Sequence, residues 1–334
     1  MSRQYIPTIG YFSDDIKNSH KLFSMLGEGA HGLMFVARNG MQNFTGKGRN
    51  IQYDNFMSLS GYQNIPLIVM APNMPLGDID FYHNPESSLA NLKLVIDFTT
   101  EFPAEKSSKI VTFHLNSLLW PDEWARFGAN PNEKLLIFNR TFSDTIFPAL
   151  VKIASYAKSR GIQLKVETTP VPEFGDIADG KLGRLGNPFP LYSGRGFSEI
   201  RKAGLGIALD FSHTFTLYKS ARLFKEKGDR VFDTYRGLFP TDVDYLNQHN
   251  LIDEVKSLKD GDVVHINDSL GLYDPSQGLV HKESVALGDG EIEELPDIIK
   301  ILKTNNLNIV FEINESDYVN RPNLIKSLEY FHAN

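Results

Sequence analysis

Five ionisable side chains each stand at the end of a short apolar run of the sequence: His114, Glu167, Asp210, His265 and Glu312. An ionised carboxylate at the inner end of a buried strand is costly unless a positive group lies beside it. Three carboxylates placed together also repel one another and raise each other's pKa values. A divalent cation removes that repulsion, and carboxylate with imidazole is a natural ligand set for such an ion. These residue types predict a metal site if the fold brings the run ends together.

Each of these residues, taken singly, has an ordinary structural explanation. A strand-end aspartate such as Asp210 often caps the next helix, and a lone histidine is more often a hydrogen-bonded core residue than a ligand. The coincidence of five such ends in succession is what favours the metal site.

The apolar runs indicate the elements that carry these residues. Eight runs are nearly continuous, as in strands covered on both faces; they span 5–12, 31–37, 65–71, 109–115, 162–168, 206–211, 262–267 and 307–313. Helical patterns lie between them and are clearest at 87–102, 139–161, 294–306 and 322–332. Strands that alternate with helices in this way predict a single (β/α)₈ TIM barrel, an α/β fold, over residues 1–334. The carboxyl ends of barrel strands form the active-site rim, so the five side chains are expected at one rim.

Two connections between the expected strands are long and rich in Gly and Pro. They span residues 170–196 after strand five and 268–291 after strand seven. Loops of this length in a compact domain are usually functional, so specificity is expected to reside in them.

The composition excludes cysteine chemistry and disfavours nucleic-acid-binding and membrane proteins. The 334 residues contain no cysteine, which excludes disulfides, thiolate metal sites and cysteine nucleophiles. The formal net charge of −7 argues mildly against a protein that mainly grips a phosphate backbone. The first residues lack the apolar core of a signal peptide, and no apolar run approaches the ~20 residues that cross a bilayer. A cytoplasmic enzyme with no membrane partner is expected.

Six short motifs, in their order and their strand-end positions, resemble those of the xylose isomerase-like barrel superfamily. The motifs are FHLNS (113–117), VETTP (166–170), LDFSH (209–213), HINDS (265–269), LGDGEI (287–292) and FEINES (311–316). That superfamily includes sugar isomerases, ketose 3-epimerases and endonuclease IV-type AP endonucleases. In the epimerases one Mn²⁺ or similar ion is held at the positions that match Glu167, Asp210, His265 and Glu312.

The resemblance to the isomerases and epimerases implies a metal-dependent enzyme that acts on a small sugar or sugar-like substrate. The ion, whether Mn²⁺, Zn²⁺, Mg²⁺ or Co²⁺, is expected to stabilise the enediolate formed when a proton leaves carbon. Glu167 and Glu312 are expected to be the acid–base pair, and His213 is expected to orient a substrate hydroxyl.

The alternative is an endonuclease IV-like zinc phosphodiesterase acting on abasic DNA, and only this alternative implies a nucleic-acid partner. There the same four positions belong to a three-zinc site, to which His114 and His213 resemble further ligands. Two departures weaken it, because Met70 and Asn73 of MAPN stand where that family has a zinc-binding His and a DNA-contacting Tyr.

The sequence leaves other points open. The second ligand pair of the nucleases has no clean match, since Lys282 and Ser284 occupy its place, but His281 and Glu283 of VHKES could replace it. The epimerase pattern also departs at Gly271, where an Arg is expected to hold substrate. A third hypothesis is that the barrel binds a ligand without catalysing a reaction. The identity of the sugar and the oligomeric state are left undetermined.

Overall fold

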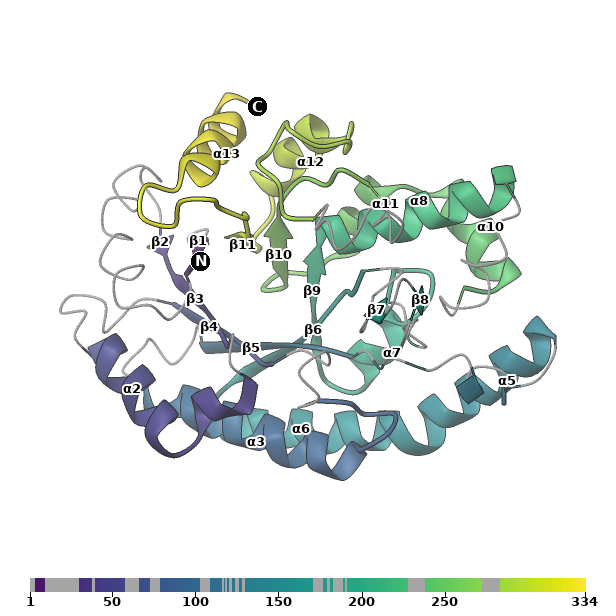
Figure 1. Ribbon diagram of the computed structural model, residues 1–334, viewed down its shortest axis with the longest axis horizontal. Helices are drawn as coiled ribbons and strands as arrows, with labels where there is room; N and C mark the ends of the chain where they lie inside the picture. The colour runs from purple at the N-terminus through teal and green to yellow at the C-terminus, as the bar shows by residue number, and fades with distance from the viewer. Residues whose placement is uncertain are drawn as a thin grey trace.

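Eight parallel strands close into a barrel in the computed structural model of this chain (Figure 1). Neighbouring strands pair in the order β1, β3, β4, β5, β6, β9, β10 and β11, and β11 pairs with β1 to complete the circle. Their bounds are Gln4–Ile9 (β1), Leu33–Val36 (β3), Leu67–Met70 (β4), Lys109–His114 (β5), Gln163–Glu167 (β6), Gly206–Asp210 (β9), Val263–Ile266 (β10) and Asn308–Phe311 (β11). The arrangement confirms the expected TIM barrel, and each strand lies within the apolar run that predicted it or begins one residue before it.

The structure describes residues 4–9, 30–37, 40–57, 66–72, 79–102, 109–115, 117, 119, 122–123, 126–127, 130–170, 177–178, 181–182, 189, 191–227, 238–271 and 283–334. Three further strands are short. β2 (Ala30–His31) pairs with β1, while β7 (Ile177–Ala178) and β8 (Lys181–Leu182) form a separate antiparallel pair. The long connections expected after strands five and seven are the ones that follow β6 and β10.

Helices surround the strands, with α3 and α6 on one side of the barrel and α12 and α13 on the other (Figure 1). The helical elements are η1 (Gly40–Phe44), α2 (Gly46–Met57), α3 (Pro85–Glu101), α5 (Pro131–Thr141), the π-helix η4 (Phe142–Ile146), α6 (Phe147–Ser159), α7 (Phe197–Lys202), α8 (Phe211–Lys227), α10 (Pro240–Gln248), α11 (Leu251–Ser257), α12 (Leu295–Leu302) and α13 (Pro322–Ala333). All four of the clearest sequence patterns are helical.

The helix expected over 139–161 begins earlier than predicted, because it is continuous with α5. Its start follows from local chemistry: Pro131 needs no hydrogen-bond acceptor in the first turn, and Asn130 accepts a hydrogen bond from the Glu133 amide at 2.9 Å. Its end is as predicted, because Gly161 follows α6 with a φ of 71° that glycine adopts without strain.

Side chains of the strands alternate between two apolar layers. The barrel interior holds Met34, Ile68, Met70, Ile110, Ala208, Val263 and Val310, with Val36 packed against them. The intervening strand residues belong to the larger core between the sheet and the helices. Because the period of a strand is two, the side chains two positions beyond Ile110, Ala208, Val263 and Val310 also point inward. The alternation therefore directs Asp210, His265 and Glu312 toward the barrel axis at its carboxyl end.

Among the residues that the structure describes, no helix combines the length and the apolar character required to cross a membrane. That residues 1–334 form one domain and that the protein is cytoplasmic stay predictions.

Replacing Ile68 in the barrel interior should destabilise the protein. Ile68 is fully buried, so Ile68→Ala removes apolar atoms and leaves a cavity, which should cost about 2–5 kcal/mol in the free energy of unfolding. Ile51 on α2 is 46% exposed, and Ile51→Ala is the matched control, with a loss below about 1 kcal/mol. Denaturant titration of both variants measures the difference, and equal losses would show that the interior layer is not packed as described.

Candidate metal centre at the barrel rim

Four of the strand-end residues converge at one point of the carboxyl rim. Glu167 ends β6, Asp210 ends β9, His265 lies in β10, and Glu312 directly follows β11. One potential ligand atom from each of the four lies within 4.8 Å of the others. His265 Nδ1 is central to the group, at 2.7 Å from Glu312 Oε2, 3.2 Å from Glu167 Oε1 and 3.8 Å from Asp210 Oδ2.

The buried polar atoms of this centre fit a cation. Glu167 and His265 are fully buried. Within the part of the chain that the structure describes, both Glu167 carboxylate oxygens and both His265 ring nitrogens lack an aligned hydrogen bond. Buried polar atoms of this kind are costly unless something coordinates them. A divalent ion accepts oxygen and imidazole ligands, so the donor set suits one.

Protons and neighbouring charges shift the pKa values of the centre. Burial alone would raise the pKa of Glu167, but the imidazoles of His265 and His114 hold it well below its usual range. Burial would lower the pKa of His265, whereas Glu167 and Glu312 raise it well above its ordinary value. For Asp210, burial dominates and raises the pKa to about 6, against the opposing effect of His213. Without a cation, protons on the imidazoles thus neutralise part of the buried acid.

Asp210 also caps the helix that follows it. Its Oδ1 accepts a hydrogen bond from the backbone amide of His213 at 2.8 Å, in the first turn of α8. Its Oδ2 accepts one from Asn267 Nδ2 at 2.8 Å, and its own amide donates to Thr168 Oγ1 at 2.9 Å. The ordinary explanation of a strand-end aspartate is therefore correct here, but it does not exhaust the carboxylate, whose oxygens have about four acceptor sites.

Sequence reasoning did not identify Thr168 and Asn267 as parts of this site. Both are buried polar residues one or two positions beyond a predicted ligand, Glu167 and His265 respectively. Polar residues in an otherwise apolar strand end are a weak signal, because rim loops are polar in any barrel. Their role here is to orient Asp210.

A second group of possible ligands shares Glu167. His114, Glu167 and His213 each offer an atom within 4.8 Å of the others, and His114 Nε2 lies 3.1 Å from Glu167 Oε1. His213 Nδ1 lies 2.7 Å from the carbonyl oxygen of Thr168, which can only accept, so this nitrogen carries the proton. His213 Nε2 faces Glu283 Oε2 at 3.4 Å. The residues proposed as additional ligands are therefore brought to the same rim, except His281, which lies outside the described residues.

The segment that presents Glu283 is held by backbone hydrogen bonds. The Ser284 amide donates to Ser212 Oγ at 3.0 Å, and the Ser284 carbonyl accepts from the Asn314 amide at 2.7 Å. Ser284 itself has a φ of 54°, a left-handed conformation that is uncommon for a residue other than glycine. Strain held in place by surrounding contacts is typical of functional segments.

The LGDGEI motif forms a nest around Asp268. The Asp268 carboxylate accepts hydrogen bonds from the backbone amides of Ser269, Gly288, Gly290 and Ile292 at 2.8–3.1 Å. A Cβ atom at Gly290 would collide with this carboxylate, so the motif needs glycine there. The nest joins the chain after β10 to the segment before α12.

The structure places some of the positions at which the sequence departs from the families it resembles. Met70, at the end of β4, packs in the barrel interior and offers no ligand. Gly271 lies after β10 with a φ of 87°. Asn73 and Lys282 lie outside the described residues.

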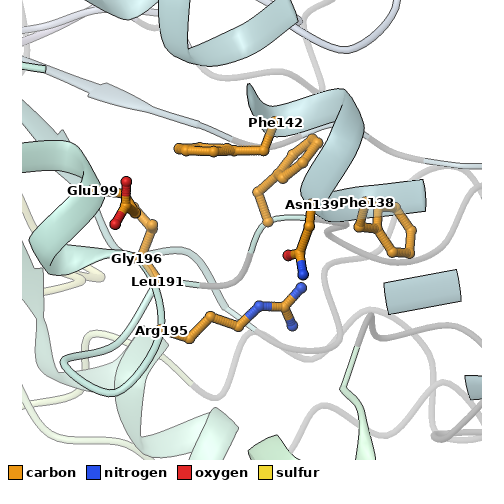
Figure 2. A pocket seen from close by; sticks show the side chains of 8 residues that line it. Phe138, Asn139, Phe142, Leu191, Arg195, Gly196 and Glu199 are labelled. Carbon is orange, nitrogen blue, oxygen red and sulfur yellow. The ribbon is translucent and has the colours of Figure 1, made fainter. Parts of the chain in front are cut away.

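An apolar hollow of about 90 Å³ lies outside this centre, between α5 and the segment that enters α7 (Figure 2). Phe138, Phe142 and Leu191 line it, and Figure 2 shows the side chains of Asn139 and Arg195 pointing toward one another. Arg195 is paired with Asp242 at 2.7 Å. None of the residues that line the hollow is a metal-ligand candidate, so it is separate from the centre.

Comparison with known proteins gave matches among solved structures. No protein-family model matches the chain, and no curated protein matches it. It is similar to a D-tagatose 3-epimerase-like protein, with a TM-score of 0.53 and 17% identity over 98% of this chain and 96% of that chain. It is also similar to D-allulose 3-epimerase from Methylomonas sp., solved in complex with D-allulose, with a TM-score of 0.52 and 10% identity over 99% and 97% of the two chains. A xylose isomerase domain protein from Planctomyces limnophilus gives a TM-score of 0.50 and 9% identity over 98% and 95%.

At these identities the comparisons show the fold. The chain shares the barrel fold of these three structures along nearly its whole length, as expected from its sequence motifs.

Proposed function

We propose that this chain is a divalent-metal-dependent isomerase or epimerase of a sugar or sugar-like substrate. The observation that carries the proposal is the convergence of Glu167, Asp210, His265 and Glu312 on one point of the rim. The buried oxygens of Glu167 and the ring nitrogens of His265 have no aligned hydrogen bond among the described residues, which supports coordination of an ion. The fold shared with sugar epimerases supports the reaction class.

The proposed ligands are Glu167, Asp210, His265 and Glu312. When bound, Mn²⁺, Zn²⁺, Mg²⁺ or Co²⁺ would supply a Lewis acid that polarises a carbonyl and stabilises the negative charge of an enediolate. Asn267 and the amide of His213 hold the Asp210 carboxylate in place, so this ligand is oriented before any ion arrives.

Proton transfer is assigned to Glu167 and Glu312, one accepting a proton from carbon and the other returning one. His265 lies between their carboxylates, at 3.2 Å and 2.7 Å. Glu167 is fully buried whereas the Glu312 side chain is 24% exposed, so the two acids have different access to solvent. His213 would orient a substrate hydroxyl through Nε2, because its Nδ1 is committed to the Thr168 carbonyl.

The nuclease alternative finds less support. Its extra ligands would have to come from His114, His213 and Glu283, and the position of one further zinc-binding His is taken by Met70, which packs in the barrel interior. A barrel that binds its ligand without turnover would not need two acids beside one imidazole. Both alternatives are decided by the assays below.

Asp210→Asn should abolish most metal binding. Loss of a direct ligand should weaken metal affinity by about a hundredfold or more, because even changes behind the ligands cost up to that amount. The metal-free variant should unfold within about 1 kcal/mol of the metal-free parent, since relief of repulsion offsets loss of the Asn267 hydrogen bond. Metal content and denaturant titration measure both effects. Asp297→Asn on the surface of α12 is the control, and a metal-free Asp210→Asn variant that unfolds much earlier would make Asp210 a purely structural residue.

Metal affinity should rise with pH. The ligands must be unprotonated, and burial raises the pKa of Asp210 to about 6, so its proton competes with the ion below that pH. Asp210 alone predicts a gain of about tenfold between about pH 5 and pH 7, and the raised pKa of His265 adds to it. Calorimetric titration in two buffers of different ionisation enthalpy measures affinity and proton release together. Affinity that is level across this range would contradict the ligand assignment.

The reaction class is tested by exchange. The purified protein, supplied with each candidate ion, should catalyse deuterium exchange at a carbon next to the carbonyl of at least one ketose in a panel. Glu167→Gln should lower this rate by about 10²–10⁴-fold through loss of an acid–base group. Glu329→Gln on the exposed face of α13 should leave it unchanged. Strand cleavage of a duplex with one abasic site, abolished by Glu167→Gln, would instead establish the nuclease alternative.

A further inference from the structure

A hollow of about 410 Å³ opens at the end of the barrel opposite the candidate metal centre, between β6 and β9. The end of α6, the first residues of β6, and Gly204 and Gly206 form its walls. Its lining includes two cations, Lys158 and Lys165, and no carboxylate. The walls of the hollow are thus positively charged.

Lys165 is the unusual residue of this hollow. It lies at the centre of β6, two positions before Glu167, and only 8% of its surface is exposed. Its nearest acid is Asp262, whose Oδ1 is 3.8 Å from Lys165 Nζ, which is beyond hydrogen-bond distance. Among the residues described, no hydrogen bond from Lys165 Nζ is found. In the part of the chain that the structure describes, this nearly buried amine has a long ion pair to Asp262 and no hydrogen bond.

Asp262 cannot easily turn to Lys165, because other donors occupy it. Arg201 NH2 donates to its Oδ2 at 2.7 Å, and the backbone amides of Ile207 and Lys259 donate to its two oxygens at 3.0 Å and 2.9 Å. The guanidinium of Arg201 also balances the charge of Asp262. Lys165 therefore shares Asp262 with Arg201, which lies closer to that carboxylate.

Gly206 makes room for the amine. Gly206 is the register partner of Lys165 in the β6–β9 pairing, and a Cβ atom there would lie 2.5 Å from Lys165 Nζ. The lysine side chain therefore passes over a strand position with no side chain.

We propose that the amino-terminal mouth of the barrel is a binding site for a small oxyanion, with Lys165 as its principal donor and Lys158 at its edge. An anion with several acceptor oxygens supplies the hydrogen bonds that the Lys165 amine lacks and offsets its charge. Inorganic phosphate, sulfate and simple carboxylates share this chemistry. The site uses none of the candidate metal ligands, so it does not depend on the proposed reaction.

Calorimetric titration of inorganic phosphate, with sulfate and acetate in parallel, tests the site. We expect wild-type protein to bind at least one of the three anions. Lys165→Met should weaken that binding about tenfold or more, as loss of a charge-assisted hydrogen bond implies. Lys202→Met is the matched control, since Lys202 is exposed on α7 and paired with Glu199, and its affinity should equal that of the wild type.

The Asp210→Asn variant distinguishes this site from anion binding at the candidate metal centre. An anion at the Lys165 site should still bind to that variant. The proposal would be overturned by equal affinity of Lys165→Met and wild type, or by loss of binding in Asp210→Asn alone. It would also be overturned if no anion binds at concentrations on the order of 50 mM, which corresponds to a binding free energy weaker than about 2 kcal/mol. If Lys165→Met does not fold, wild-type protein is labelled with acetic anhydride with and without phosphate and analysed by mass spectrometry. Protection of Lys165 relative to Lys202 supports the site, and equal labelling overturns it.

Discussion

Three carboxylates and two imidazoles, all buried except the partly exposed Glu312, meet at one end of the barrel. Their mutual neutralisation constrains the residues around them. His265 lies within 3.8 Å of carboxylate oxygens of Glu167, Asp210 and Glu312. Such a group is stable only when positive charge balances the acids, whether on the imidazoles or on an ion. The raised pKa of His265 expresses this requirement, whereas the pKa of Asp210 is raised mainly by burial.

The same requirement explains how the rim is built. Asp210 has to stay in a fixed position, and it is held because one of its oxygens caps α8 while the other accepts a hydrogen bond from Asn267. One carboxylate therefore caps α8 and is at the same time held in the orientation of a candidate metal ligand. The nest around Asp268 fixes the connection that follows Asn267, so the orienting residue is itself anchored.

Strand β6 carries charge at two levels of the barrel. Glu167 faces inward at the carboxyl rim, and Lys165 faces inward two positions earlier, about 7 Å along the strand. Between apolar layers of the interior, each of these charges needs its own compensation. The acid has the imidazoles of His114 and His265, whereas the amine shares Asp262, at 3.8 Å, with Arg201. The two ends of the barrel thus differ in how the charge on β6 is compensated.

The sequence by itself determined the barrel and the rim at which its strand-end side chains lie. Apolar runs of strand length and the period of two are local properties, so Asp210, His265 and Glu312 could be placed at one rim without any long-range information. The tertiary structure alone decided which loop residues meet them. Glu283 lies beside His213, Asn267 beside Asp210, and Lys165 beside the Asp262 that Arg201 already occupies. These pairs are separated by tens of residues, and their contacts depend on packing and on backbone choices such as the left-handed Ser284. Apart from Glu283, which the VHKES motif suggested, no pattern in the sequence identifies these contacts, because the energy that selects them arises only when the distant elements are already side by side.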